Sequence, residues 1–178
     1  MVAVNASEPQ SQPEPWLRGP IADVHPLVMP VFFSFAQVRE DLAKHTEGLS
    51  REQVWRKASH ASLGFHMKHL AGSVHRLTTY LMGGQLSEEQ LQSLRMEAQG
   101  DEEIQELLQM MDESLTASEE KLRTIDPNSL YQKRTVGRKE LPTSVLGLLV
   151  HLAEHTQRHL GQAIILAQIA RQKIDVRF

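Results

Sequence analysis

The sequence predicts an all-α protein: a four-helix bundle with a long crossover connection before the last helix and a flexible, proline-rich N-terminal arm. Four long segments repeat apolar residues at three- and four-residue spacing, as helices with one buried face do. No two segments show a convincing strand pattern, and residues 125–142 form one long connection. The length of 178 residues suits one domain. We therefore expect an arm at 1–22 and a single bundle domain at 23–178.

The arm and the first helix meet in a proline-rich region. Residues 1–20 hold four of the eight prolines, a composition that buries little surface, and we expect Trp16 and Leu17 to dock this arm onto the body. The first long helix is predicted over 24–48. Only the first turn of a helix tolerates proline, so Pro26 and Pro30 belong there, and Gly48 ends the helix.

The remaining elements follow from the same apolar spacing and from capping signals. The second long segment, for example, has an apolar stripe of Leu63, Met67, Leu70, Val74, Leu77 and Leu81. Ser87 followed by acidic residues predicts the start of a short helix. The connection begins with a turn, and its "LYQKRTV" is compatible with extended backbone. The predicted helices are 59–82, 87–98, 101–124 and 143–171.

Composition excludes several classes of function. A net charge of −3 gives no electrostatic footprint for nucleic acid. The absence of cysteine excludes disulfides, thiolate zinc sites and a cysteine nucleophile. No apolar stretch approaches the length of a membrane span, and the N-terminal residues lack the features of a signal peptide. We expect a cytoplasmic protein that acts on a small molecule, with no nucleic-acid or membrane partner.

Two groups of histidines are the candidate site. His151, His155 and His159 are four residues apart and therefore project from one side of the last helix, at the edge of its apolar stripe. On the second long helix, His66 and His69 begin a polar flank beside the core. A metal site in a bundle needs a ligand from another helix. The spacing alone favours neither His66 nor His69 for that ligand.

Other interpretations of the histidines stay open at this point. A buried imidazole needs a hydrogen-bond partner or a metal, so a structural stripe is nearly as well supported as a metal site, and a pH-sensing cluster is a weaker third. The zincin motif is excluded because Thr156, Gln157 and Arg158, and no glutamate, separate the last two histidines.

The segments "HMKHLAGSVHRLTTYL" and "HLAEHTQRHLGQAI" resemble the DinB-like (DinB/YfiT-type) superfamily of metal-binding four-helix bundles, over about residues 25–172. This resemblance implies three metal ligands, His69, His155 and His159. His66 and His151 would then be neighbours of the metal or face a substrate. The further candidate pocket residues are Ser73, Arg76 and Tyr80, which continue the polar flank of the second long helix, and Arg158. We expect Arg76, Tyr80 and Arg158 to orient an anionic thiol or substrate, and no catalytic residue is assigned.

The resemblance also implies a chemistry. Superfamily members include bacterial S-transferases that use bacillithiol or mycothiol, so the implied cofactors are a divalent metal, Zn²⁺ or Ni²⁺ above all, and a low-molecular-weight thiol as cosubstrate. The leading hypothesis is a metal-dependent S-transferase or a related hydrolase. One alternative is a non-catalytic, metal-stabilised or stress-associated bundle that binds a partner or forms a homodimer; Phe32, Phe33 and Phe35 exceed what one helix face needs. The third hypothesis is a helical module that binds a partner and whose histidines are structural.

Overall fold

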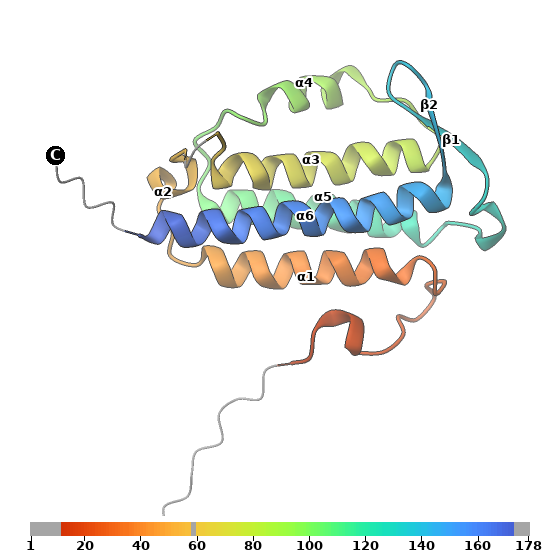
Figure 1. Ribbon diagram of the computed structural model, residues 1–178, viewed down its shortest axis with the longest axis horizontal. Coiled ribbons are helices and arrows are strands. Elements are labelled where there is room, and N and C mark those ends of the chain that lie inside the picture. The colour runs from red at the N-terminus through yellow and green to blue at the C-terminus, as the bar shows by residue number, and fades with distance from the viewer. Residues whose placement is uncertain (1–11, 58–59, 173–178) are drawn as a thin grey trace, which may run out of the picture.

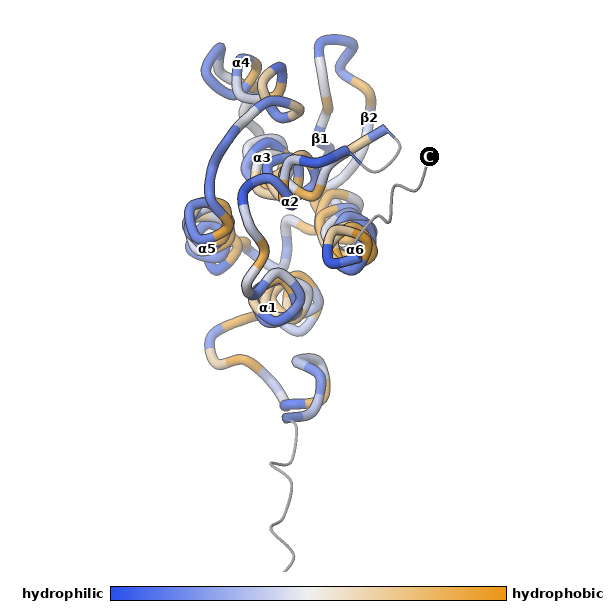
Figure 2. Tube along the Cα trace, turned by 90° about the vertical axis from the view of Figure 1, so that its left-hand side faces the viewer, coloured by the Kyte–Doolittle hydropathy of each residue, from blue (hydrophilic) through white to orange (hydrophobic). Residues whose placement is uncertain are grey.

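Four long helices form the body of the molecule, and a short helix and a β-hairpin lie at its edge (Figure 1). The computed structural model describes residues 12–57 and 60–172. Its long helices are α1 (Met29–Thr46), α3 (Leu63–Leu81), α5 (Ile104–Leu122) and α6 (Val145–Arg171). Viewed along their axes, they occupy the corners of a square around one core (Figure 2). The predicted all-α bundle is confirmed.

The helices run as two parallel pairs. Arg171 at the end of α6 donates from Nη2 to the carbonyl of Glu47 just after α1, at 2.7 Å, so α1 and α6 end together. Lys68 near the start of α3 bonds Glu102 just before α5, at 2.6 Å, so α3 and α5 start together. The segment that returns along the bundle is therefore 82–103, which contains α4 (Glu88–Met96), whereas residues 123–144 join α5 to α6 at one end (Figure 1). The crossover thus precedes α5 and not, as predicted, the last helix.

Serine caps fix where three of the helices begin. Ser62 accepts a hydrogen bond from the Phe65 amide at the start of α3, and Ser144 accepts one from Gly147 at the start of α6. Ser87 and Gln90 form a capping box at α4, as the sequence predicts. The predicted start of the second helix at residue 59 lies outside the described residues.

The first helix is shorter than predicted, and a second, short helix follows it. Val24 and Val28 are buried like the apolar residues of the helix, but both precede its first residue. The apolar spacing therefore predicted a start that was too early. Pro30 is in the first turn, as expected. Gly48, with φ +73°, follows the end of α1. A capping box at Ser50 then starts α2 (Arg51–Trp55), which the apolar spacing did not predict.

The connection before α6 corrects the expectation that the chain lacks paired strands. β1 (Lys133–Val136) and β2 (Leu141–Ser144) form an antiparallel hairpin, with Lys133 opposite Ser144. The "LYQKRTV" segment is extended at β1. Pro142 lies in β2, an edge strand, where a missing amide donor is tolerated. The hairpin escaped prediction because its strands are four residues long and mostly polar.

The arm contacts the body from residue 12 onward, while its first eleven residues lie outside the described part. A 3₁₀ turn, η1 (Pro15–Leu17), packs beside α1. Trp16 and Leu17 are 60% and 56% exposed, so the expectation that they dock the arm is wrong. Instead Pro15 is buried, and Arg18 makes two hydrogen bonds to Glu40, at 2.5 and 2.8 Å. Within the described residues, no helix is long and apolar enough to cross a membrane.

Candidate metal centre

The packing of α3 against α6 brings His69, His155 and His159 together. One ring nitrogen of each lies within 4.8 Å of the other two. The ring centroids of His69 and His159 are 4.4 Å apart, and those of His155 and His159 are 4.5 Å apart. On α6 the four-residue spacing places two imidazoles one turn apart beside the buried Leu152 and Leu160. Ligand atoms so close need only small side-chain rotations to share an ion, since Zn–N bonds of about 2.0–2.1 Å place tetrahedral ligands about 3.4 Å apart.

Each of the three rings has its Nδ1 atom engaged by a neighbour. His69 donates Nδ1–H to the Glu97 carboxylate at 2.7 Å, because an ionised carboxylate can only accept. The Ser73 hydroxyl donates to the carbonyl of Leu70, so its oxygen accepts from Nδ1 of His155 at 3.4 Å. These contacts leave the Nε2 lone pairs of both rings for a metal.

The third ring meets a fourth histidine. The Nδ1 atoms of His66 and His159 are 3.1 Å apart, so one ring donates to the other. When His159 is the donor, its Nε2 also keeps a lone pair. His66 is buried, and this contact places it directly behind one of the three candidate ligands. Metal-binding imidazoles usually have such a partner on their second nitrogen, which fixes tautomer and ring orientation.

The electrostatics of the site keep two of its imidazoles neutral. Burial, and then the neighbouring charge of His69, lowers the pKa of His159 to about 3. The same two causes lower the pKa of His155 to about 4. Burial also lowers the pKa of His66. At neutral pH these rings therefore carry lone pairs and no competing proton, which is the protonation state that a metal requires.

Glu97 is a site residue that the sequence analysis missed. It lies immediately after α4, is 3% exposed, and accepts hydrogen bonds from His69 and, at 2.6 Å, from Nη1 of Arg76. Gly72 makes room for it, because a Cβ there would lie 2.5 Å from Oε1 of Glu97 and 2.6 Å from Nη1 of Arg76. Nothing in the apolar spacing distinguishes Glu97 from its exposed acidic neighbours. A glycine inside a helix, between His69 and Arg76, was the available signal of a close approach.

The other predicted residues lie at different distances from the three rings. Ser73 contacts His155 and Arg76 holds Glu97, so both act on the candidate ligands indirectly. His151 stacks edge-on against His155, with centroids 5.2 Å apart, and bonds Glu154 at 2.6 Å. Tyr80 packs in the hydrophobic core.

Arg158 borders a cavity beside the rings. Its guanidinium pairs with Glu154 at 2.5 Å, one turn back on α6, and more than half of its side chain is exposed. The cavity, of about 660 Å³, is lined by Arg158 and His66 together with the apolar Ile165 and Leu166 of α6. His66 lines this cavity and also contacts His159, so it lies between the cavity and one of the three candidate ligands.

Three converging imidazoles with oriented nitrogens suit a divalent metal that keeps open coordination positions, as catalytic metal sites do. The model of the family described as mycothiol S-transferase matches residues 32–175, a range that contains the three candidate ligands, His66, His151 and Glu97 but excludes the arm. None of the curated proteins matches the chain.

Proposed function

The chain belongs to the mycothiol S-transferase family, which confirms the predicted DinB-like superfamily, and from this premise we propose that it is a metal-dependent thiol S-transferase. In the proposed reaction a low-molecular-weight thiol loses its S–H proton. The sulfur forms a bond to an electrophilic carbon, and the leaving group departs with the electron pair of its bond and takes up the proton. Mycothiol or a related thiol is the proposed cosubstrate.

The observation that carries the proposal is the convergence of three imidazoles whose second nitrogens are held by Glu97, Ser73 and His66. His69, His155 and His159 are the proposed ligands of a divalent cation, Zn²⁺ or Ni²⁺. When bound, the cation would supply a Lewis acid that lowers the pKa of the thiol, so that thiolate exists at neutral pH. The protein holds the rings oriented before the cation arrives.

The cavity beside His66 is the proposed path of the second substrate. Ile165 and Leu166 offer apolar surface to its carbon skeleton. Arg158 offers a positive charge to an anionic group, because its pairing with Glu154 is an exposed helix pair that a ligand exchanges at little cost. We therefore propose electrophiles with an apolar body and an acidic group as the first substrates to test.

Metal content is the first test. The purified chain should bind about one equivalent of Zn²⁺ or Ni²⁺, and His155→Ala and His159→Ala should bind neither tightly. His45→Ala is the matched control, because His45 lies in the last turn of α1, outside this group of rings. Equal binding by the parent and both site variants would remove the metal from the proposal.

Turnover is the second test. The metal-loaded protein should consume a low-molecular-weight thiol together with an electrophile, stripping the metal should abolish this consumption, and restoring it should recover the rate. A protein that binds the metal and gains stability, yet turns over no thiol with any electrophile tested, would instead match the non-catalytic bundle.

A further inference from the structure

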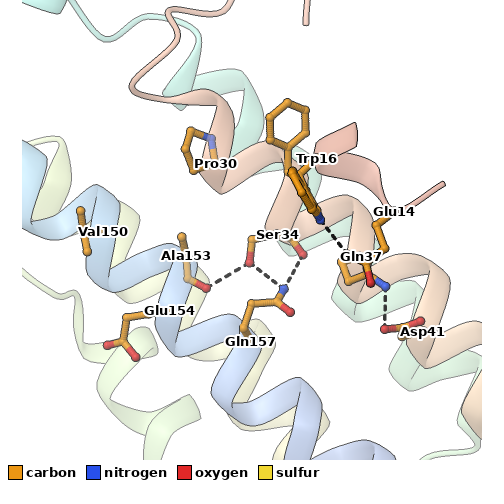
Figure 3. Close-up of a pocket in the computed structure, with 11 residues that line it drawn as sticks. Glu14, Trp16, Pro30, Ser34, Gln37, Asp41, Val150, Ala153, Glu154 and Gln157 are labelled. Atoms are coloured by element: carbon orange, nitrogen blue, oxygen red, sulfur yellow. Dashed lines mark hydrogen bonds between the residues drawn. The ribbon is translucent and has the colours of Figure 1, made fainter. Parts of the chain in front are cut away.

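A second cavity, of about 840 Å³, lies between η1, α1 and α6, and none of the histidines lines it (Figure 3). We call it the α1–α6 groove. Its apolar walls are Trp16, Pro30, Phe33 and Val150. Its volume is within the range of about 300–1,000 Å³ that is usual for small-molecule sites.

The arm builds one wall of this groove, and its contacts hold that wall in place. Arg18 donates hydrogen bonds to both carboxylate oxygens of Glu40 on α1 and to the carbonyl of Pro13. Pro15, the first residue of η1, is buried. Trp16 is nevertheless 60% exposed, and its ring borders the groove. An anchored segment that presents a large aromatic ring to a cavity is better suited to holding a ligand than to filling the core. This segment lies outside the range matched by the family.

The groove is lined by three carboxylates, Glu14, Asp41 and Glu154, of which Glu154 pairs with Arg158. Asp41 accepts from the Gln37 amide at 2.7 Å, and Glu14 accepts from the Trp16 indole at 2.6 Å. None of the ion pairs among the described residues includes Glu14 or Asp41. The described lining also contains no lysine or arginine. Figure 3 shows both carboxylates on the same side of the groove, near Trp16 and Gln37.

We propose that the α1–α6 groove binds a small organic cation, that is, an amine or guanidine with an apolar body. Its positive group lies against Asp41 and Glu14, where the charge that the protein leaves unpaired attracts it. Its apolar body lies against Phe33 and Trp16, whose ring face also favours a cation. This site is separate from the proposed transferase centre and does not depend on a metal.

A titration with a cation and its neutral analogue tests the proposal. The probes are 2-phenylethylammonium and 2-phenylethanol, added to the full chain, with binding followed by tryptophan fluorescence and by calorimetry. We expect the cation to bind saturably and at least about fivefold more tightly than the alcohol. Asp41→Asn should lower the affinity for the cation by a similar factor and leave the affinity for the alcohol unchanged. Trp16→Leu should lower both affinities.

Two control variants make the test specific. Glu113→Gln removes an exposed acid on α5, far along the chain from the groove lining, and should bind the cation as the parent does. His155→Ala should also bind it normally, so the result is independent of the transferase proposal. Equal affinity for the two probes, or no saturable binding of the cation, would overturn the proposal. So would a self-association of the chain that Val150→Asp abolishes, because the groove would then be an interface between copies.

Discussion

At the scale of single residues, His159 and His155 link the stability of the metal-free protein to pH. Burial lowers their pKa values to about 3 and about 4, from an ordinary value of 6.5. Above pH 6.5 both rings are neutral in the folded and unfolded states. Below it the unfolded chain binds protons that the folded chain cannot, so stability falls as the pH drops from about 6.5 towards about 3.

The measurement is urea unfolding of the metal-stripped protein at pH 7.5 and pH 5. We expect a lower midpoint at pH 5, and we expect His159→Gln and His155→Gln each to reduce the difference between the two midpoints. His45→Gln is the control, because it replaces a histidine outside the site with the same residue. An unchanged difference in both site variants would contradict the assignment of these pKa shifts.

Glu97 acts on the metal centre through His69. Its carboxylate accepts from His69 and from Arg76, and both Glu97 and Arg76 are buried. Glu97→Gln keeps the shape but removes the charge that orients the imidazole, so we expect metal affinity to fall about 10–100-fold. Competition with a chelator measures it. Glu89→Gln on the exposed side of α4 is the control, and equal affinities of the two variants would refute a positioning role for Glu97.

At the scale of elements, substitution by alanine should have different effects at two glycines inside helices. Gly161 on α6 has open space where a Cβ would lie, so Gly161→Ala should stabilise the protein by about 0.5–1 kcal/mol through helix propensity. A methyl group at residue 72 of α3 would instead collide with the Glu97 and Arg76 side chains. Gly72→Ala should therefore lose that gain and weaken metal binding, as thermal unfolding and chelator competition would show. A stabilised Gly72→Ala variant with normal metal affinity would contradict this.

The elements also show what the sequence could and could not predict. The long helices, and the position of His151, His155 and His159 on one side of the last helix, follow from spacing along one helix, which depends only on local geometry. The choice of His155 and His159 among these three came from the resemblance. The choice of His69 over His66 came from the resemblance, because the angle between α3 and α6 is a tertiary property. Glu97 and the hairpin were missed for the same reason: a buried acid after an exposed helix, and two short polar strands, are defined by their partners across the fold.

At the scale of the whole molecule, the proposed metal connects helices that are distant in sequence. His69 is on α3, which pairs with α5, and His155 and His159 are on α6, which pairs with α1. An ion bound by all three would thus join the two parallel helix pairs across the core. Polar contacts already link the two pairs, since Arg39 of α1 pairs with Asp112 and Glu119 of α5. The ion pair of Arg76 with Glu97 ties α3 to the segment that returns along the bundle.

A metal that binds only the folded chain must therefore raise its stability. At a free concentration of 100 times Kd, the gain is about 2.7 kcal/mol, which in a chain of this size corresponds to a rise in Tm of about 5–10 °C. Thermal unfolding with Zn²⁺, with chelator and after re-addition of Zn²⁺ measures this gain. We expect His155→Ala to unfold at one temperature under all three conditions, while Glu113→Gln, with its exposed acid on α5, follows the parent. If Zn²⁺ raised the Tm of His155→Ala as much as that of the parent, the stabilising ion would lie elsewhere, and the three histidines would be partners of one another rather than ligands.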